Sequence, residues 1–137
     1  MTTPVLLALG GAPFESAVVV GLQAARREVQ IVRRCVDVPD LLAAAATGQA
    51  QAVLVSTATP RLDADLVAAL RARRVEPIGL VGHDETGTAA EHRLHQIGVR
   101  AVLPADSEGL GTRVTSVLER AGTPPPAFEA PAGAEPE

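Results

Sequence analysis

The sequence contains no lysine, tryptophan or tyrosine, and only two phenylalanines and one cysteine among its 137 residues. Without lysine the chain has neither the lysine of a P-loop nor a Schiff-base lysine. Two aromatic rings are too few to bind single-stranded nucleic acid by base stacking. The single cysteine, Cys35, excludes an internal disulfide and a cysteine-based metal cluster within one chain, so we expect a reducing, cytoplasmic environment.

Charge and hydropathy exclude further classes of function. The net charge is -4, and the 12 basic residues are all arginines without a long basic run, so we expect no nucleic-acid partner. No apolar run approaches the roughly 18 residues of a membrane span. The N-terminus lacks the basic start and the cleavage site of a signal peptide. We therefore expect no membrane insertion.

What the sequence does contain is an alternation of short apolar runs with helical patterns. Five runs have the length of strands: Val5–Leu9, Val29–Arg33, Ala52–Val55, Ile78–Val81 and Ala101–Leu103. Right-handed crossovers between them predict an α/β fold, a three-layer α/β/α sandwich around a five-stranded parallel sheet. The flavodoxin-like strand order 2-1-3-4-5 is the leading choice at this size. The second run would then be an edge strand, in agreement with its polar residues Gln30, Arg33 and Arg34.

Five helices are predicted between and after these strands. Pro13 suits the first turn of the first helix, and Asp37 and Asp63 are N-caps for the second and third. Thr88 with Glu91 forms a capping box for the fourth helix, and the fifth begins near Asp106 or Ser107. The predicted inner faces are Val18, Leu22 and Ala25; Leu41, Leu42 and Ala45; Leu66, Ala69 and Leu70; Ala90, Leu94 and Ile97; and Leu110, Val114, Val117 and Leu118.

The composition divides the chain into two parts. Residues 1–121 carry the βα pattern and form the expected single domain. Residues 122–137 are rich in Pro, Ala and Gly and are expected to be a disordered linker, which suggests that a further domain follows in a longer protein.

The spacing of residues 4–121 resembles the CheY-like receiver domain of bacterial response regulators. An active receiver uses two acids that hold Mg²⁺, a phosphate-accepting aspartate, a Ser or Thr, and a lysine before a proline. The corresponding positions here are Gly10 and Gly11, Ser56, Gly82, Leu103 and Pro104, of which only the proline matches. The resemblance therefore implies a degenerate pseudo-receiver that is not an enzyme and has no cofactor.

Two stretches carry a more specific resemblance. Val32–Ala45 and Arg93–Val99 look like the receiver-like N-terminal domain that precedes a MinD-type ATPase in the TadZ and CpaE proteins of pilus assembly and in related actinobacterial proteins. This resemblance implies a domain for positioning and self-association, with ATP handled by a following domain.

In receivers, the fourth helix, fifth strand and fifth helix form the usual surface for dimers and partners. From this resemblance we expect residues 88–121 to form the surface that binds a second copy of the chain, as a homodimer, or another protein partner. The candidate contacts are His92, Arg93, Gln96, Arg113, Ser116 and Arg120. Ordinary solvent-exposed helix is the alternative explanation of the same residues.

Two other interpretations stay open at this stage. The loops that hold Gly10 and Gly11, and Ser56 to Thr59, offer amides and hydroxyls to a small molecule or nucleotide. A metal could conceivably be shared by His92 and His95 with His83 or Asp84. Both histidines are explained more simply as solvent-exposed residues near the start of a helix. Ser56 is explained more simply as a small turn residue, and Cys35 as an inert, half-buried thiol.

Overall fold

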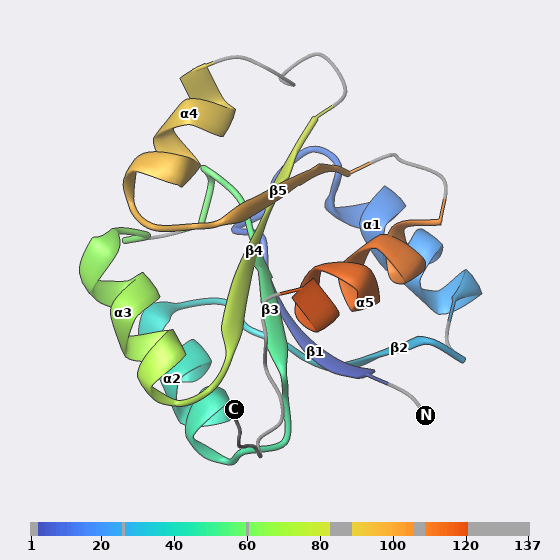
Figure 1. Cartoon of the computed structure of the whole chain (residues 1–137), viewed down its shortest axis with the longest axis horizontal. Helices are drawn as coiled ribbons and strands as arrows, with labels where there is room; N and C mark the ends of the chain where they lie inside the picture. The colour runs from blue at the N-terminus through green and yellow to red at the C-terminus, as the bar shows by residue number, and fades with distance from the viewer. Residues whose placement is uncertain (1–2, 26, 60, 83–88, 106–108, 121–137) are drawn as a thin grey trace, which may run out of the picture.

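The computed structural model describes residues 3–25, 27–59, 61–82, 89–105 and 109–120, and Figure 1 shows a central sheet between two layers of helices. The strands are β1 (Thr3–Ala8), β2 (Val29–Arg34), β3 (Ala52–Val55), β4 (Glu76–Val81) and β5 (Ala101–Pro104). All neighbouring pairs are parallel, in the order β2-β1-β3-β4-β5. The predicted three-layer fold and strand order are confirmed.

Five helices connect and follow the strands. They are α1 (Glu15–Ala24), α2 (Val38–Ala46), α3 (Ala64–Ala72), α4 (Ala89–Gln96) and α5 (Leu110–Arg120). Helices α1 and α5 cover one face of the sheet, and α2, α3 and α4 cover the other (Figure 1).

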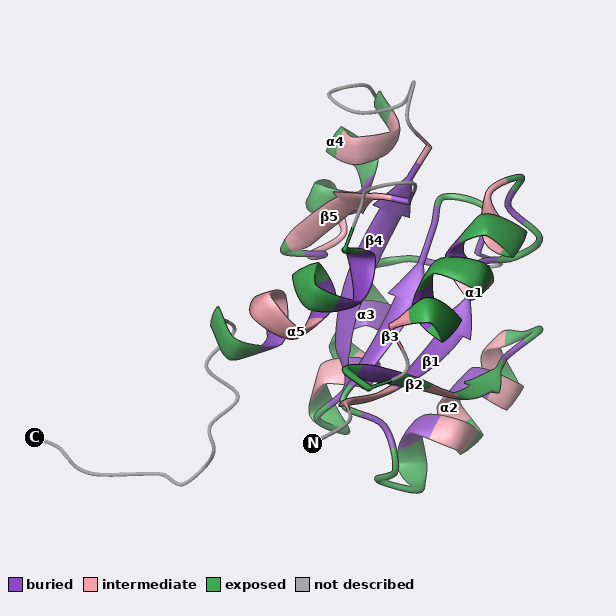
Figure 2. Ribbon diagram, turned by 90° about the vertical axis from the view of Figure 1, so that its right-hand side faces the viewer, coloured by how far each residue is buried: buried purple, intermediate pink, exposed green. Residues whose placement is uncertain are grey.

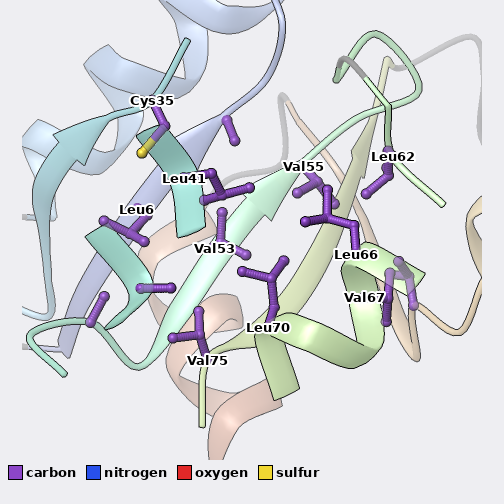
Figure 3. Packing of buried hydrophobic residues seen from close by; sticks show 14 of the residues in the cluster. Leu6, Cys35, Leu41, Val53, Val55, Leu62, Leu66, Val67, Leu70 and Val75 are labelled. Carbon is purple, nitrogen blue, oxygen red and sulfur yellow. The ribbon is translucent and has the colours of Figure 1, made fainter. Parts of the chain in front are cut away.

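Alternation along the central strands divides the apolar interior between the two faces. In β1, Leu6 and Ala8 pack with α2 and α3, whereas Val5 and Leu7 pack with α1 and α5. Figure 3 shows the first of these clusters, in which leucines and valines of the strands and helices interdigitate without an aromatic ring. Strands β3 and β4 are buried at every position (Figure 2), as expected for a parallel sheet covered on both faces.

Strand β2 is the predicted edge. Only Val29 of its six residues is buried, and its last three residues are exposed. Its two arginines form ion pairs with carboxylates of the same chain. Arg33 pairs with Asp40 at 2.5 Å, and Arg34 pairs with Glu15 at 2.6 Å.

Two predicted helix starts are confirmed in atomic detail. The Asp37 carboxylate accepts a hydrogen bond from the Asp40 amide, and the Asp63 carboxylate accepts one from the Leu66 amide, each at 2.8 Å. These bonds satisfy amides that the first turn of a helix leaves without a partner.

The start of α1 differs from the prediction. The helix begins at Glu15, with Phe14 rather than Pro13 at the boundary, and no side chain caps it. The reason is that residues 9–12 form a tight turn before the helix, which moves its first turn two residues along. In α3 the inner face is Leu66, Val67 and Leu70, while Ala69 is only half-buried. Several predicted features lie outside the described residues: Thr88, Asp106, Ser107 and residues 122–137.

Candidate functional site

Ser56 follows β3 at the position where a receiver carries its phosphate-accepting aspartate. It is 2% exposed, and all of its polar atoms have partners within the chain. The hydroxyl donates to the Leu9 carbonyl oxygen at 2.8 Å and accepts from the Ala58 amide at 3.1 Å. The Ser56 amide donates to the Thr59 hydroxyl at 2.9 Å, and the Ser56 carbonyl accepts from the Thr59 amide at 3.0 Å. Ser56 therefore joins the ends of β1 and β3.

Thr59 provides a second connection between the same two strands. It is 6% exposed, and its hydroxyl donates to the carbonyl oxygen of Ala8 while it accepts from the Ser56 amide. The two hydroxyls thus bind consecutive carbonyls, those of Ala8 and Leu9. We call Ser56, Thr59 and these two carbonyls the hydroxyl clamp.

The turn after β1 lies directly against the loop that carries the hydroxyl clamp. Gly10 and Gly11 have φ values of 68° and 77°, and the Ala12 amide donates to the Leu9 carbonyl at 3.2 Å. Positive φ at both central residues is the pattern of a type I′ turn, which glycine adopts without steric cost. A Cβ atom at Gly10 would lie 2.0 Å from the carbonyl oxygen of Ala58, whereas one at Gly11 would meet nothing within 4 Å. The two loops are therefore in backbone contact where an active receiver needs space for its two acids.

The remaining positions of the receiver site are also without charge. Gly82 directly follows β4 and is half-buried. Leu103 lies opposite Leu80 in the sheet and packs against the apolar cluster under α1 and α5. Pro104 ends β5 opposite Val81. An apolar side chain occupies the place of the lysine, and it cannot contact a phosphoryl group electrostatically.

A small cavity lies beside the hydroxyl clamp, lined by residues that include Ala8, Cys35, Leu41 and Thr59. Its volume is about 10 Å³, which is the space of about one water molecule. Cys35 is 7% exposed, and burial, followed by the charge of Asp40, raises the pKa of its thiol above the ordinary 9.0. A thiol with a raised pKa is a poor nucleophile at neutral pH. This agrees with an inert role for Cys35, which is more deeply buried than the predicted half-buried thiol.

The histidines do not assemble a metal site within the described residues. His92 is exposed on α4. The Nδ1 atom of His95 lies 3.0 Å from the Val99 carbonyl oxygen, and its Nε2 atom lies 3.7 Å from the Glu91 carboxylate. Among the described residues no group of three or more His, Cys, Asp or Glu side chains could hold a metal ion. The other two candidates, His83 and Asp84, lie outside this part of the chain.

The predicted contact residues flank β5 from both faces of the sheet. His92, Arg93 and Gln96 lie on α4, and Arg113, Ser116 and Arg120 lie on α5. All are exposed except Ser116, which is half-buried. Since α4 and α5 cover opposite faces, the six residues do not form one cluster, and a partner that contacted all of them would have to reach around the β5 edge.

Comparison with known proteins gives matches among solved structures. The signal receiver domain of the response regulator NarL from Mycobacterium tuberculosis superposes with a TM-score of 0.64 at 24% identity, over 89% of this chain and 98% of that one. A chain from the complex of the P1 domain of CheA3 with CheY6 from R. sphaeroides gives a TM-score of 0.65 at 14% identity, over 86% and 95%. A CheY-like receiver domain protein from Methanospirillum hungatei gives 0.61 at 13% identity, over 88% and 96%. This chain has the receiver fold. No family model matches the sequence, and no curated protein matches it.

Within this receiver fold, sequence reasoning placed Ser56 and Thr59 in one possible ligand-binding loop but missed the bonds of Thr59 to Ser56 and Ala8. The available signal was local, because two hydroxyl residues three positions apart after a strand are typical of a side-chain turn that caps its own backbone. The bond from Ser56 to Leu9 spans 47 positions and has no such signal.

The part of the chain that the structure describes contains no helix long and apolar enough to cross a membrane.

Proposed function

We propose that this domain is a pseudo-receiver, a receiver fold that takes no phosphoryl group and acts through its outer surface as a protein-interaction module. The observation that carries the proposal is the closed state of the Ser56 position. Its hydroxyl is buried and fully occupied by the Leu9 carbonyl and the Ala58 amide. A phosphoryl donor would have to break the hydroxyl clamp to reach it.

The chemistry of the surroundings supports the same proposal. Phosphoryl transfer depends on cations that neutralise the phosphate. The positions of the metal-holding acids are Gly10 and Gly11, and the position of the lysine is Leu103. Without acceptor, metal ligands or compensating charge, the domain is not expected to be an enzyme.

The alternative, a small-molecule or nucleotide sensor that uses the same loops, is weakened by the geometry. The hydroxyls that such a ligand would use, those of Ser56 and Thr59, bind backbone carbonyls instead. The contact between Gly10 and Ala58 closes the space between the two loops.

Treatment with acetyl phosphate and Mg²⁺, followed by intact-mass spectrometry, tests the proposal. We expect no phosphoryl adduct, and no rise in melting temperature with beryllofluoride and Mg²⁺. An active CheY-like receiver treated in parallel is the positive control. A stoichiometric adduct, or a melting-temperature rise with beryllofluoride or a nucleotide, would overturn the proposal.

The resemblance of Val32–Ala45 and Arg93–Val99 to the receiver-like domain of TadZ and CpaE proteins extends the proposal. We infer a cytoplasmic module that localises an attached or associated MinD-like ATPase in pilus assembly, secretion, or positioning at the cell pole or septum, with the α4-β5-α5 side as its partner surface. Affinity capture from the native cell with the domain as bait tests this. Recovery of a MinD-type ATPase that is lost on Arg93→Glu would support the extension, and capture unaffected by that change would contradict the assigned surface.

A further inference from the structure

Exposed arginines gather at the end of the sheet where β4 and β5 begin. Arg73 and Arg74 lie in the turn between α3 and β4, and Arg100 lies in the turn between α4 and β5. The two turns are joined, because the Arg71 guanidinium donates to the Gly98 carbonyl oxygen at 2.6 Å. We call Arg73, Arg74 and Arg100 the arginine surface.

The carboxylates of the same layer of helices lie at the opposite end of the sheet. Helices α2, α3 and α4 begin there, and the acids in or just before their first turns are Asp37, Asp40, Asp63, Asp65 and Glu91. At the end with the arginine surface, Glu76 is 7% exposed and is held by Arg71. The neighbouring turn, residues 47–51 between α2 and β3, contains no charged residue. The arginine surface is therefore positive in a chain whose net charge is -4.

The fold does not use the charges of this surface. The Arg73 guanidinium donates to the Ala69 carbonyl oxygen at 3.0 Å, a contact within the end of α3. Within the part of the chain that the structure describes, no hydrogen bond or ion pair involves the side chain of Arg74 or Arg100. Cations near the end of a helix complement its dipole, but Arg71 and Arg73 already do so for α3, and Arg100 lies beyond the end of α4.

Arg74 has a backbone conformation that normally selects glycine. Its φ is 63°, and α3 ends there in a Schellman motif. The Arg74 amide donates to the Arg71 carbonyl oxygen at 2.9 Å, and the Val75 amide donates to the Leu70 carbonyl oxygen at 3.0 Å. Val75 is fully buried, so the motif itself is held by packing at the residue that follows the arginine.

Helix α4 ends in the same motif with a glycine at the corresponding position. The Gly98 amide donates to the His95 carbonyl oxygen and the Val99 amide to the Leu94 carbonyl oxygen, each at 3.1 Å, and φ of Gly98 is 102°. A left-handed residue with a Cβ atom carries a conformational cost that glycine avoids. The chain thus keeps Arg74 where glycine would give a more stable helix end. A conformational cost of this kind, at a side chain without a contact of its own, points to a function of the residue.

We propose that the arginine surface is a docking site for an acidic peptide segment of a protein partner. Guanidinium groups bind carboxylates through two parallel hydrogen bonds, so three of them without an intervening acid fit a short run of Asp or Glu side chains. The proposal goes beyond the proposed function, because it assigns a second surface and the chemistry of its partner.

Other anionic partners fit this surface less well. The exposed large apolar side chains among the described residues lie elsewhere, so the surface offers a bilayer nothing to insert. They are Val20, Val32 and Val36. A nucleic acid carries a long array of phosphates, which the net charge of -4 repels beyond the three arginines.

Fluorescence anisotropy with a fluorescein-labelled octaglutamate peptide tests the proposal. The unmodified chain is expected to bind at about 20 mM salt and to bind more weakly at about 150 mM, because salt screens exposed charges. Arg74→Gly is expected to weaken binding about threefold, and Arg74→Gly combined with Arg100→Ala about tenfold. Since the glycine relieves the left-handed conformation, Arg74→Gly is also expected to raise the midpoint of urea denaturation.

Arg61→Gly is the matched control. Arg61 is exposed and has a φ of 55°, but it lies at the opposite end of the sheet, before the acids Asp63 and Asp65 of α3. The substitution removes the same charge and relieves the same backbone conformation as Arg74→Gly. It is expected to raise the urea midpoint and to leave the binding of octaglutamate unchanged.

Four outcomes would overturn the inference. They are no binding of octaglutamate at low salt, equal weakening by Arg61→Gly and Arg74→Gly, a lower urea midpoint for Arg74→Gly, and tighter binding of phosphatidylserine vesicles or a single-stranded oligonucleotide than of octaglutamate. The third would show that the fold itself uses the Arg74 side chain. None of these outcomes touches the pseudo-receiver proposal, which fails only if the phosphoryl or ligand assays are positive.

Discussion

The Ser56 hydroxyl donates to the Leu9 carbonyl oxygen at 2.8 Å and so joins the ends of two neighbouring parallel strands. In Ser56→Ala this bond is lost, and the Leu9 carbonyl and the Ala58 amide lose a buried partner. We expect a loss of about 1–2 kcal/mol in the free energy of unfolding, measured by urea denaturation.

Ser56→Asp is the sharper form of this test, because it restores the side chain of an active receiver. A carboxylate cannot donate to the Leu9 carbonyl, and it would be buried without a cation. We expect Ser56→Asp to be less stable than Ser56→Ala and to remain unmodified by acetyl phosphate. A variant as stable as the unmodified protein, or one that becomes phosphorylated, would show that the site is more open than the structure indicates.

Gly10 and Gly11 provide a matched pair. Both have positive φ, so alanine at either position carries the cost of a left-handed residue, about 1–2 kcal/mol. Only at Gly10 does the new Cβ atom also meet the Ala58 carbonyl oxygen, at 2.0 Å. We expect Gly10→Ala to be less stable than Gly11→Ala by roughly 1–3 kcal/mol in urea denaturation. Equal losses would mean that the two loops are not in contact.

How much of this could be predicted differs between the fold and the site. The strands follow from apolar runs, and the helix starts at Asp37 and Asp63 follow from local capping, in which side chain and amide are three residues apart. The absence of the receiver's acids and lysine is read directly from the residue types at the strand ends.

The closure of the site was not predictable in the same way. It depends on the approach of Gly10 to Ala58 and of Ser56 to Leu9, across two loops that are far apart in sequence. The same limit applies to the contacts of Arg71, whose partners lie outside its own helix.

Arg71 links α3 to β4 and to the turn that follows α4. Its guanidinium donates to both carboxylate oxygens of Glu76, the first residue of β4, at 3.4 and 3.0 Å, and to the Gly98 carbonyl at 2.6 Å. The Glu76 side chain is 9% exposed. Removing one partner of a buried pair leaves an uncompensated charge, so we expect Arg71→Ala to lose roughly 3 kcal/mol in the free energy of unfolding.

A double variant distinguishes the ion pair from its isolated charges. Arg71→Met combined with Glu76→Met removes both charges and keeps the volume, and we expect it to lie within about 1 kcal/mol of the unmodified protein. Additive losses from the two single substitutions would contradict the coupling that the geometry implies.

Cys35 predicts a specific alkaline pH dependence. Because burial raises the pKa of its thiol, the folded state holds the proton more tightly than the unfolded chain does. The contribution of this thiol to the free energy of unfolding is fully present below the ordinary pKa of 9.0. It decreases as the pH rises through the raised pKa, and at higher pH it no longer changes. The chain has no lysine and no tyrosine, the other side chains that ordinarily titrate in this range.

The measurement is the urea midpoint at intervals between pH 8.5 and 11, with Cys35→Ala as the control. We expect the midpoint of the unmodified protein to decline across this range relative to that of the control. Parallel curves for the two proteins would show that the thiol has its ordinary pKa and is not buried.

The strand order has a consequence for synthesis of the chain. Strand β1 pairs with β3, and the bond between Ser56 and Leu9 closes a loop of 47 positions, at an entropic cost of roughly 3 kcal/mol. As the chain leaves the ribosome, β1 and β2 emerge well before β3, so one edge of the apolar β1 strand has no partner until residue 56 is free. During that interval the growing chain exposes an unprotected strand edge of the kind that aggregates. The bond between Ser56 and Leu9 therefore also marks the point at which the nascent chain no longer exposes this strand edge.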